Sequence, residues 1–119
     1  VTLEAARRFA DAGRLIVIFQ PHRYSRTKAF AEQFAKELDV ADRAILLEVY
    51  AASEKPIEGV NSKIITSKMS KGEYIPNFVE VTDSVIGDAQ PGDVIMTLGA
   101  GDVSSLAPII VEGLTRRFA

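Results

Sequence analysis

Short apolar runs alternate with amphipathic stretches along almost the whole chain. The apolar runs are four or five residues long, which is a length typical of buried strands. They lie at residues 15–19, 44–47, 78–81 and 94–98, and the third alternates only weakly. Strands that are apolar on both faces need helices on both sides of a parallel sheet. The pattern therefore predicts a doubly wound α/β domain with a mostly parallel sheet and helices on both faces.

Five helices are predicted around these strands, because apolar residues recur there every three or four positions. Each has a polar residue that can cap its first turn. The cap candidates are Thr2, Ser25 or Thr27, Asn61 or Ser62, Thr82 or Asp83, and Ser104 or Ser105. The residues expected to face inward are Leu3, Ala6, Phe9 and Ala10; Phe30, Phe34 and Leu38; Ile64, Ile65 and Met69; Val85, Ile86 and Ala89; and Leu106, Ile110 and Leu114. Gly13 and Gly72 are expected to end the first and third helices.

Length and composition exclude several classes of protein. A chain of 119 residues is one domain by length. Its net charge of -2 gives no general attraction to nucleic acid or to an anionic membrane, and its basic residues do not interleave with aromatic ones. No apolar run approaches the roughly 18 residues that span a bilayer. The lack of cysteine excludes disulfides and thiolate metal sites and fits a reducing compartment. Because the first residue is Val1 rather than Met, we expect a domain excised from a longer protein.

The residues with the most unusual chemistry lie directly after predicted strands. In a doubly wound sheet, every strand-to-helix loop emerges at the carboxyl edge. The loops at residues 22–26, 50–54 and 99–102 should therefore share one rim, and we expect a binding site there.

Two arginines and the only histidine follow the first strand, at His22, Arg23 and Arg26. Cations are disfavoured at a helix N-terminus, which carries partial positive charge, so their presence suggests an anion supplied from outside. A guanidinium fork fits a carboxylate or phosphate bidentately. His22 could make only a local hydrogen bond, but its place beside Arg23 favours ligand contact. No carboxylates stand at the spacing of a metal site around it.

The other candidate residues have ordinary explanations as well. Tyr50 could be a packed aromatic residue, and Glu54 a surface acid. Gly99 and Gly101 allow close backbone approach to an anion, but glycine also closes many strand-to-helix turns. The chain has no P-loop for ATP phosphates, no complete dinucleotide-binding glycine motif and no Ser-His-acid arrangement.

Three blocks nevertheless resemble one family in order and spacing: residues 19–27, residues 48–54 and residues 99–102. They are similar to the C-terminal domain of Mur ligases of peptidoglycan synthesis, specifically those that join L-alanine to UDP-N-acetylmuramate. The resemblance covers nearly the whole chain. One departure is visible, because Ser53 stands where this family is expected to carry glycine, and this puts the shape of the Tyr50 loop in question.

The resemblance implies that residues 1–119 are the Rossmann-like, amino-acid-binding domain of a three-domain cytoplasmic enzyme. The N-terminal domain would hold UDP-N-acetylmuramate, and the central domain ATP and Mg²⁺. The lactyl carboxylate becomes an acyl phosphate, which the amine of L-alanine attacks. By resemblance, the substrate-binding residues are His22, Arg23, Arg26, Tyr50 and Glu54, with backbone contact at Gly99 and Gly101. No catalytic or metal-binding residue is expected in this chain, and alone it should be inactive. Neither nucleic acid nor membrane is an expected partner.

Two alternatives stay open from the sequence. The related ligase that recycles murein peptides shares the architecture, although a different loop is expected there in place of residues 21–23. A stand-alone anion-binding signalling module fits the length and the α/β order. Signalling receivers need acidic residues after the first strand, where this chain has Gln20, Pro21, His22 and Arg23.

Overall fold

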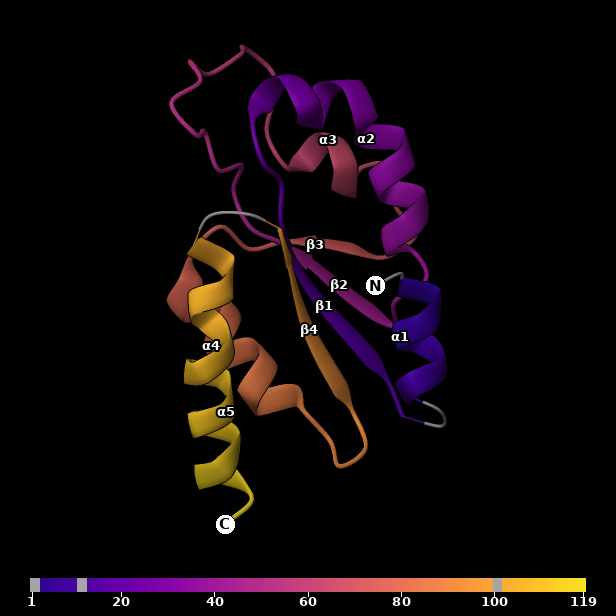
Figure 1. Ribbon diagram of the computed structural model, residues 1–119, viewed down its shortest axis with the longest axis vertical. Coiled ribbons are helices and arrows are strands. Elements are labelled where there is room, and N and C mark those ends of the chain that lie inside the picture. Colours follow the sequence, from indigo (N-terminus) through magenta and orange to yellow (C-terminus); the bar gives the residue numbers. More distant parts are fainter. Residues whose placement is uncertain (1–2, 11–12, 100–101) are drawn as a thin grey trace.

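The computed structural model describes residues 3–10, 13–99 and 102–119. Four strands in this part of the chain form one parallel sheet in the order β3-β2-β1-β4 (Figure 1). The prediction of a doubly wound α/β domain is confirmed. The elements are α1 (Leu3–Ala10), β1 (Leu15–Gln20), α2 (Tyr24–Leu38), β2 (Arg43–Leu46), α3 (Lys63–Thr66), β3 (Gly72–Tyr74), α4 (Phe78–Asp88), β4 (Val94–Gly99), the 3₁₀ helix η1 (Asp102–Ser105) and α5 (Leu106–Arg117).

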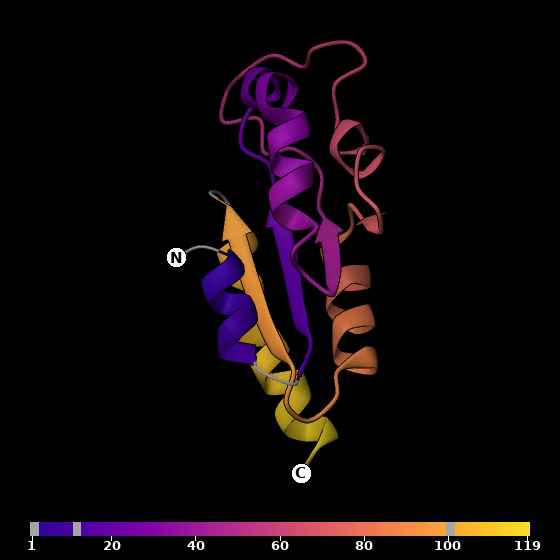
Figure 2. The same ribbon diagram turned by 90° about the vertical axis from the view of Figure 1, so that its right-hand side faces the viewer.

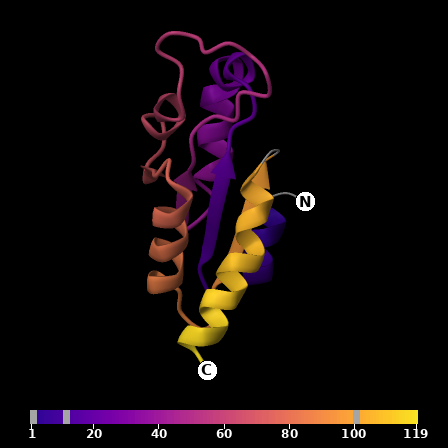
Figure 3. The same ribbon diagram turned by 90° about the vertical axis from the view of Figure 1, so that its left-hand side faces the viewer.

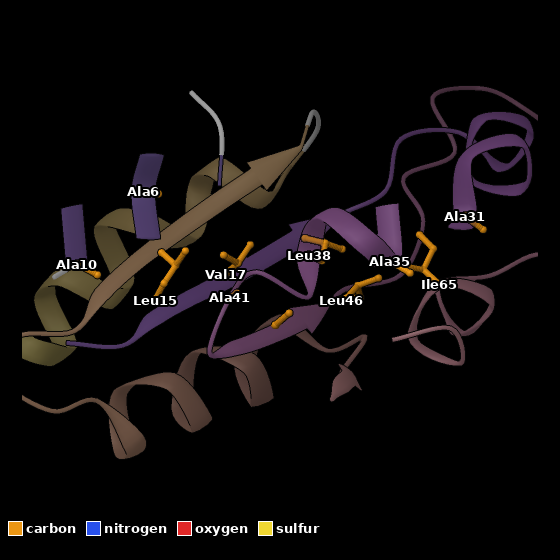
Figure 4. Close-up of a cluster of buried hydrophobic side chains, with 11 residues drawn as sticks. Ala6, Ala10, Leu15, Val17, Ala31, Ala35, Leu38, Ala41, Leu46 and Ile65 are labelled. Carbon is orange, nitrogen blue, oxygen red and sulfur yellow. The ribbon is translucent and has the colours of Figure 1, made fainter. Parts of the chain in front are cut away.

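Strand β1 lies in the middle of the molecule and divides its core in two. Successive side chains of a strand point to opposite faces. Leu15 and Val17 therefore pack under α1, α2 and α3 (Figure 4), whereas Ile16 and Ile18 pack under α4 and α5. All four are fully buried. Figures 2 and 3 show the two helical layers on either side of the sheet. No helix in the described part of the chain is long and apolar enough to cross a membrane.

The prediction of a strand at residues 78–81 is wrong, because these residues begin α4. The Asn77 side chain accepts hydrogen bonds from the backbone N–H groups of Val79 and Glu80 and so caps the helix. Val81 and Val85 then lie one turn apart and are both buried. The strand on the outer side of β2 is instead the short β3, which the sequence pattern did not indicate.

Most predicted helix starts also differ from the structure. Helix α2 begins at Tyr24, so Ser25 and Thr27 lie inside it, as Thr82 and Asp83 do in α4. At α3 the Asn61 alternative is supported, because its Oδ1 accepts a hydrogen bond from Lys63 N at 2.8 Å, whereas Ser62 makes no side-chain cap. Ser104 and Ser105 lie within η1, and Ser105 makes no side-chain cap of α5. Thr2 lies outside the described residues, as does the side chain of Phe9.

The predicted inward faces are mostly correct. Phe30 is the exception, and the third helix is shorter than predicted. Phe30 is 47% exposed, because the buried side of α2 carries Thr27, Ala31 and Ala35 together with Leu38, which is buried as predicted. Helix α3 ends at Thr66, and Gly72 starts β3 rather than closing that helix. Leu106 and Ile110 of α5 are buried as predicted.

A network of ion pairs joins the strands at the amino edge of the sheet. Arg14 binds both oxygens of Asp93 and also reaches Asp88. Arg43 pairs with Glu73 through two nitrogens and contacts the same Asp88. These contacts connect β1, β2, β3 and α4 to the turn before β4, at the end of the sheet opposite the strand-to-helix loops. The cations here are paired with anions of the protein itself.

We expect Asp93→Asn to destabilise the fold by about 2 kcal/mol, the scale of a charge-assisted hydrogen bond. The Asp93 side chain is 4% exposed and also accepts from the backbone N–H groups of Arg14 and Gln90. Its hydrogen bond with Arg14 holds the pKa of Asp93 below its usual 3.8. A carboxyl whose pKa is lowered on folding stabilises the protein above its unfolded pKa and stops doing so below its folded pKa.

Urea denaturation at pH 7 and at pH 3 checks this expectation. The difference between wild type and Asp93→Asn should be largest at pH 7 and smaller at pH 3. Asp83→Asn on the exposed side of α4 is the matched control and should change little at either pH. A difference at pH 7 no larger than that of the control would show that the Arg14 pair contributes nothing.

Candidate functional site

The loop that follows β1 and the segment that follows β2 are joined by backbone hydrogen bonds. Tyr50 N donates to Pro21 O at 2.8 Å, and Arg23 N donates to Tyr50 O at 2.8 Å. His22 and Tyr50 form an isolated parallel bridge. The pairing of β1 with β2 thus resumes beyond the strand ends. It brings the first two predicted loops to one rim, as the sequence indicated.

The rings of His22 and Tyr50 lie against each other across this pairing. Their centroids are 5.8 Å apart, and the planes differ by only 14°. Both residues are half-buried. The stacking orients the imidazole at the rim.

Arg23 has a backbone conformation that is unusual for a residue with a side chain. Its φ is 70° and its ψ 141°, immediately before the first residue of α2. Such a conformation costs about 1–3 kcal/mol and persists only where its surroundings enforce it. Here the Arg23 carbonyl accepts from Thr27 N and from Thr27 Oγ1, at 3.1 and 2.7 Å, and its N–H bonds Tyr50. The side chain extends into solvent at the rim.

Glu54 supplies an anion to the N-terminus of α2. One carboxylate oxygen accepts from Ser25 N at 2.9 Å and the other from Ser25 Oγ at 2.5 Å. These two hydrogen bonds, with the charge of Arg23 nearby, hold the pKa of Glu54 below its ordinary value of 4.5. The anion at this helix end therefore comes from the protein itself. The expectation that it must come from outside is corrected for the helix, and any ligand anion would have to bind the arginine side chains instead.

The Glu54 loop reaches α2 through two residues in left-handed conformation. Ala52 has a φ of 48° and Ser53 a φ of 71°. This is the region that glycine adopts most easily. Ser53 thus keeps the backbone shape that glycine would favour at this position.

Arg26 is exposed on the first turn of α2, and its guanidinium lies over the ring of Phe30, 5.9 Å from the centroid. Phe30 contacts Phe34 edge-on, and Phe34 packs on Phe19 of β1. No ion pair of Arg26 occurs among the described residues. The aromatic contacts orient the cation and leave its charge unpaired.

A small cavity of about 240 Å³ opens beside these cations, and its wall includes His22, Arg26 and Gly99. The remaining wall residues are Phe19, Gln20 and Phe34. Gly99 has a φ of 122°, and a side chain there would place its Cβ 2.3 Å from the Gln20 carbonyl oxygen. Only glycine lets β4 end so close to β1. Arg23, Tyr50 and Glu54 do not line this cavity, and Gly101 lies outside the described residues.

Gln20 is the wall residue that the sequence analysis did not select. The available signal was a polar residue ending an otherwise apolar buried strand. A larger cavity of about 750 Å³ lies between α1 and α2, with Leu3, Phe34 and Leu98 in its wall, and neither His22 nor Arg26 lines it. In the part of the chain that the structure describes, no group of three His, Cys, Asp or Glu side chains could hold a metal ion.

Comparisons with known proteins agree with the resemblance. Residues 1–101 match the family described as Mur ligase, glutamate ligase domain. The chain is 47% identical over 120 residues to the UDP-N-acetylmuramate--L-alanine ligase of Mycobacterium ulcerans, and 45% identical over 122 residues to that of Thermobifida fusca. These alignments cover 98% and 94% of the chain, but only 25% and 26% of the relatives.

A solved structure shows a similar fold. The murein peptide ligase of Psychrobacter arcticus superimposes with a TM-score of 0.72 over 94% of this chain and 24% of that protein. Sequence identity is 14%, so this similarity concerns the fold alone.

We expect Glu54→Gln to loosen the N-terminus of α2 at neutral pH, because a neutral amide is a weaker partner for two donors and for the helix end. Since folding lowers the pKa of Glu54, its stabilising effect is present above about pH 4.5 and is lost as pH falls through the lower folded pKa. Hydrogen exchange of the Ser25 and Arg26 amides should accelerate in the variant at pH 7. Glu58→Gln, an exposed residue of the same loop, is the control. Unchanged exchange in Glu54→Gln would exclude a capping role.

Proposed function

Because the chain belongs to the Mur ligase family, we propose that it is the C-terminal, amino-acid-binding domain of a UDP-N-acetylmuramate–L-alanine ligase of peptidoglycan synthesis. The observation that carries the proposal is the small cavity at the carboxyl edge of β1 and β4, with His22 and the unpaired Arg26 in its wall. The names of relatives at 47% and 45% identity support L-alanine as the substrate.

The chemistry of the rim suits an amino acid that reacts through its amine. Such a substrate must be held by its carboxylate, so that the nitrogen stays free. A guanidinium binds a carboxylate with paired, charge-assisted hydrogen bonds. Arg26 is held over Phe30 and Arg23 projects from a strained backbone at the same rim, so both cations are available to one carboxylate. We assign His22 as the third contact and Tyr50 as its support.

The roles of the remaining candidates differ in kind. Glu54 acts on the substrate through α2, because it holds the helix end from which Arg23 and Arg26 project. Gly99 acts by its lack of a side chain, which lets β4 end against the Gln20 backbone at the wall of the cavity.

In the proposed reaction, the amine of L-alanine forms a bond with the carbonyl carbon of an acyl phosphate. Phosphate leaves with the electron pair of the broken C–O bond, and the amine loses its proton to water or to a base. ATP with Mg²⁺ supplies the phosphoryl group that activates the carboxylate. The described residues contain no group of three His, Cys, Asp or Glu side chains that could hold a metal ion, and we place the nucleotide and Mg²⁺ in other parts of the parent protein.

The chain spans about a quarter of the length of the curated relatives it matches. We therefore propose that UDP-N-acetylmuramate binds outside this chain and that the parent protein acts in the cytoplasm, where ATP and UDP-sugars are available. The recycling of murein peptides stays the second candidate, because the resemblance in sequence implies the same architecture for both ligases. A stand-alone signalling module has no support in the family match.

We expect Arg26→Ala and Arg23→Ala to weaken the use of L-alanine in the full-length parent by about 1.5–3 kcal/mol each, the scale of a charge-assisted hydrogen bond. Neither side chain is buried, so the melting temperature should change little. Steady-state kinetics with varied L-alanine measure the loss in kcat/KM. Arg116→Ala on α5, where the arginine forms an exposed ion pair with Glu112, removes the same charge far from the rim and should leave kcat/KM unchanged.

Two results would contradict this proposal. The first is unfolding of either variant without a change in L-alanine dependence. The second is efficient use of a murein peptide, rather than L-alanine, by the wild-type parent, which would favour the recycling ligase instead.

A further inference from the structure

Gln20, the last residue of β1, carries a buried polar atom that nothing in the described part of the protein satisfies. The residue is 6% exposed. Its Nε2 donates to the Glu48 backbone oxygen at 3.4 Å, and its Oε1 has no hydrogen-bond partner. A backbone carbonyl can only accept, so the contact with Glu48 fixes which end of the amide is which. Oε1 is therefore an acceptor without a donor, and a buried acceptor in this state costs free energy unless a ligand or water supplies one.

The position of Gln20 in the sheet is that of a ligand-binding residue. In the order β3-β2-β1-β4 the chain runs from β1 to β2 and β3 on one side and then crosses back to β4 on the other side of β1, so the strand order reverses between β1 and β4. Open α/β sheets bind ligands in the crevice at such a switch point, outside the carboxyl ends of the strands. Gln20 pairs with Gly99 at this point and lines the cavity that His22 and Arg26 also line.

The neighbouring carboxylate of Glu48 already has a hydrogen-bond donor at each oxygen. One oxygen of Glu48 accepts from Val49 N at 2.8 Å, and the other accepts from the hydroxyl of Tyr74. Burial, together with this contact, raises the pKa of Tyr74 to about 12, so the hydroxyl keeps its proton and its bond to Glu48. The Gln20 amide is thus the acceptor of this edge that remains unused.

We infer that Gln20 Oε1 accepts a hydrogen bond from the amino group of the bound amino acid, and that this contact selects α-amino acids over carboxylic acids that lack an amine. The inference rests on the proposed function. The cations of Arg23 and Arg26 alone would bind any small carboxylate. A buried acceptor that is left unpaired by a ligand without an N–H group gives the discrimination that cations cannot provide.

A neutral amide also suits a reacting amine better than a carboxylate would. The amine must lose a proton before it attacks, and a nearby negative charge stabilises the protonated form and raises its pKa. An amide oxygen orients the nitrogen without adding that charge. The amide cannot itself accept the proton, so Gln20 is a binding residue, and the proton leaves by another route.

Gln20→Met tests the contact in the full-length parent, because it keeps the volume and removes the acceptor. Two constants are measured: KM for L-alanine and the competitive inhibition constant of propionate, which is alanine without its amine. We expect KM to rise 10- to 100-fold and the propionate constant to change less than twofold. An equal rise in both constants would show a structural role, and no change in either would exclude the contact. Both results overturn the inference.

Gln20→Glu provides a second, independent readout. It retains an acceptor but adds a charge, so KM for L-alanine should stay nearer to the wild-type value than in Gln20→Met. The acidic limb of the kcat profile should shift to higher pH, because the bound amine holds its proton more tightly. A profile identical to that of the wild type, with KM as poor as in Gln20→Met, would contradict the inference.

Arg26→Ala separates failure of this inference from failure of the proposed function. If the rim binds the carboxylate, Arg26→Ala weakens L-alanine and propionate together, whatever Gln20 does. If Arg26→Ala changes neither constant, or if the wild-type parent does not use L-alanine, the proposed function itself is wrong, and the inference is overturned with it.

Discussion

The candidate site depends on two backbone hydrogen bonds that continue the pairing of β1 and β2 past the strand ends. They join Tyr50 to Pro21 and Arg23 across the rim. Without them, the loops would have no fixed relation, because each leaves the sheet separately. With them, the histidine ring lies on Tyr50, Arg23 is held in its strained conformation and Glu54 comes within reach of Ser25. The backbone pairing thus positions the side chains of the rim, so these side chains are not needed to hold the two loops together.

The two edges of the sheet use charge in opposite ways. At the amino edge, Arg14 and Arg43 are paired with acids of the protein, and these pairs hold strands and helices together. At the carboxyl edge, Arg26 rests on an aromatic ring and has no acid partner among the described residues. The ion pairs that hold the strands and helices together and the proposed binding site therefore lie at opposite ends of one sheet. This arrangement leaves the charge of Arg26 available to a ligand.

The sequence predicted the fold class because the strands of a doubly wound sheet are apolar on both faces, and this pattern is visible in the sequence. Leu15 and Val17 point to one face of the sheet, and Ile16 and Ile18 point to the other. In the structure, helices cover both faces. The error at residues 78–81 has a definite origin. Val79 and Val81 favour strands in isolation, whereas the cap from Asn77 and burial against the sheet favour the helix that forms. Strand β3 was missed because three residues carry too little pattern to detect.

The sequence could place the loops of the candidate site at the carboxyl edge of the sheet, but it could not predict most contacts between them. His22, Arg23 and Arg26 could be selected because two arginines and a histidine are unusual directly after a buried strand. The capping by Glu54 could not be foreseen, since Ser25 lies 29 positions away and the contact depends on the turn at Ala52 and Ser53. Gln20 escaped notice because its importance comes from an unpaired atom, and only a structure reveals that.

The most direct test of the account is a titration of the 119-residue chain with L-alanine, followed by backbone amide chemical shifts. Ordering a small ligand costs several kcal/mol, which a few contacts on an open rim barely offset. The account predicts a dissociation constant on the order of millimolar or weaker, about -4 kcal/mol at best. Shifts should be confined to residues 20–27 and Gly99. Saturable micromolar binding, or shifts centred on the apolar cavity between α1 and α2, would contradict it.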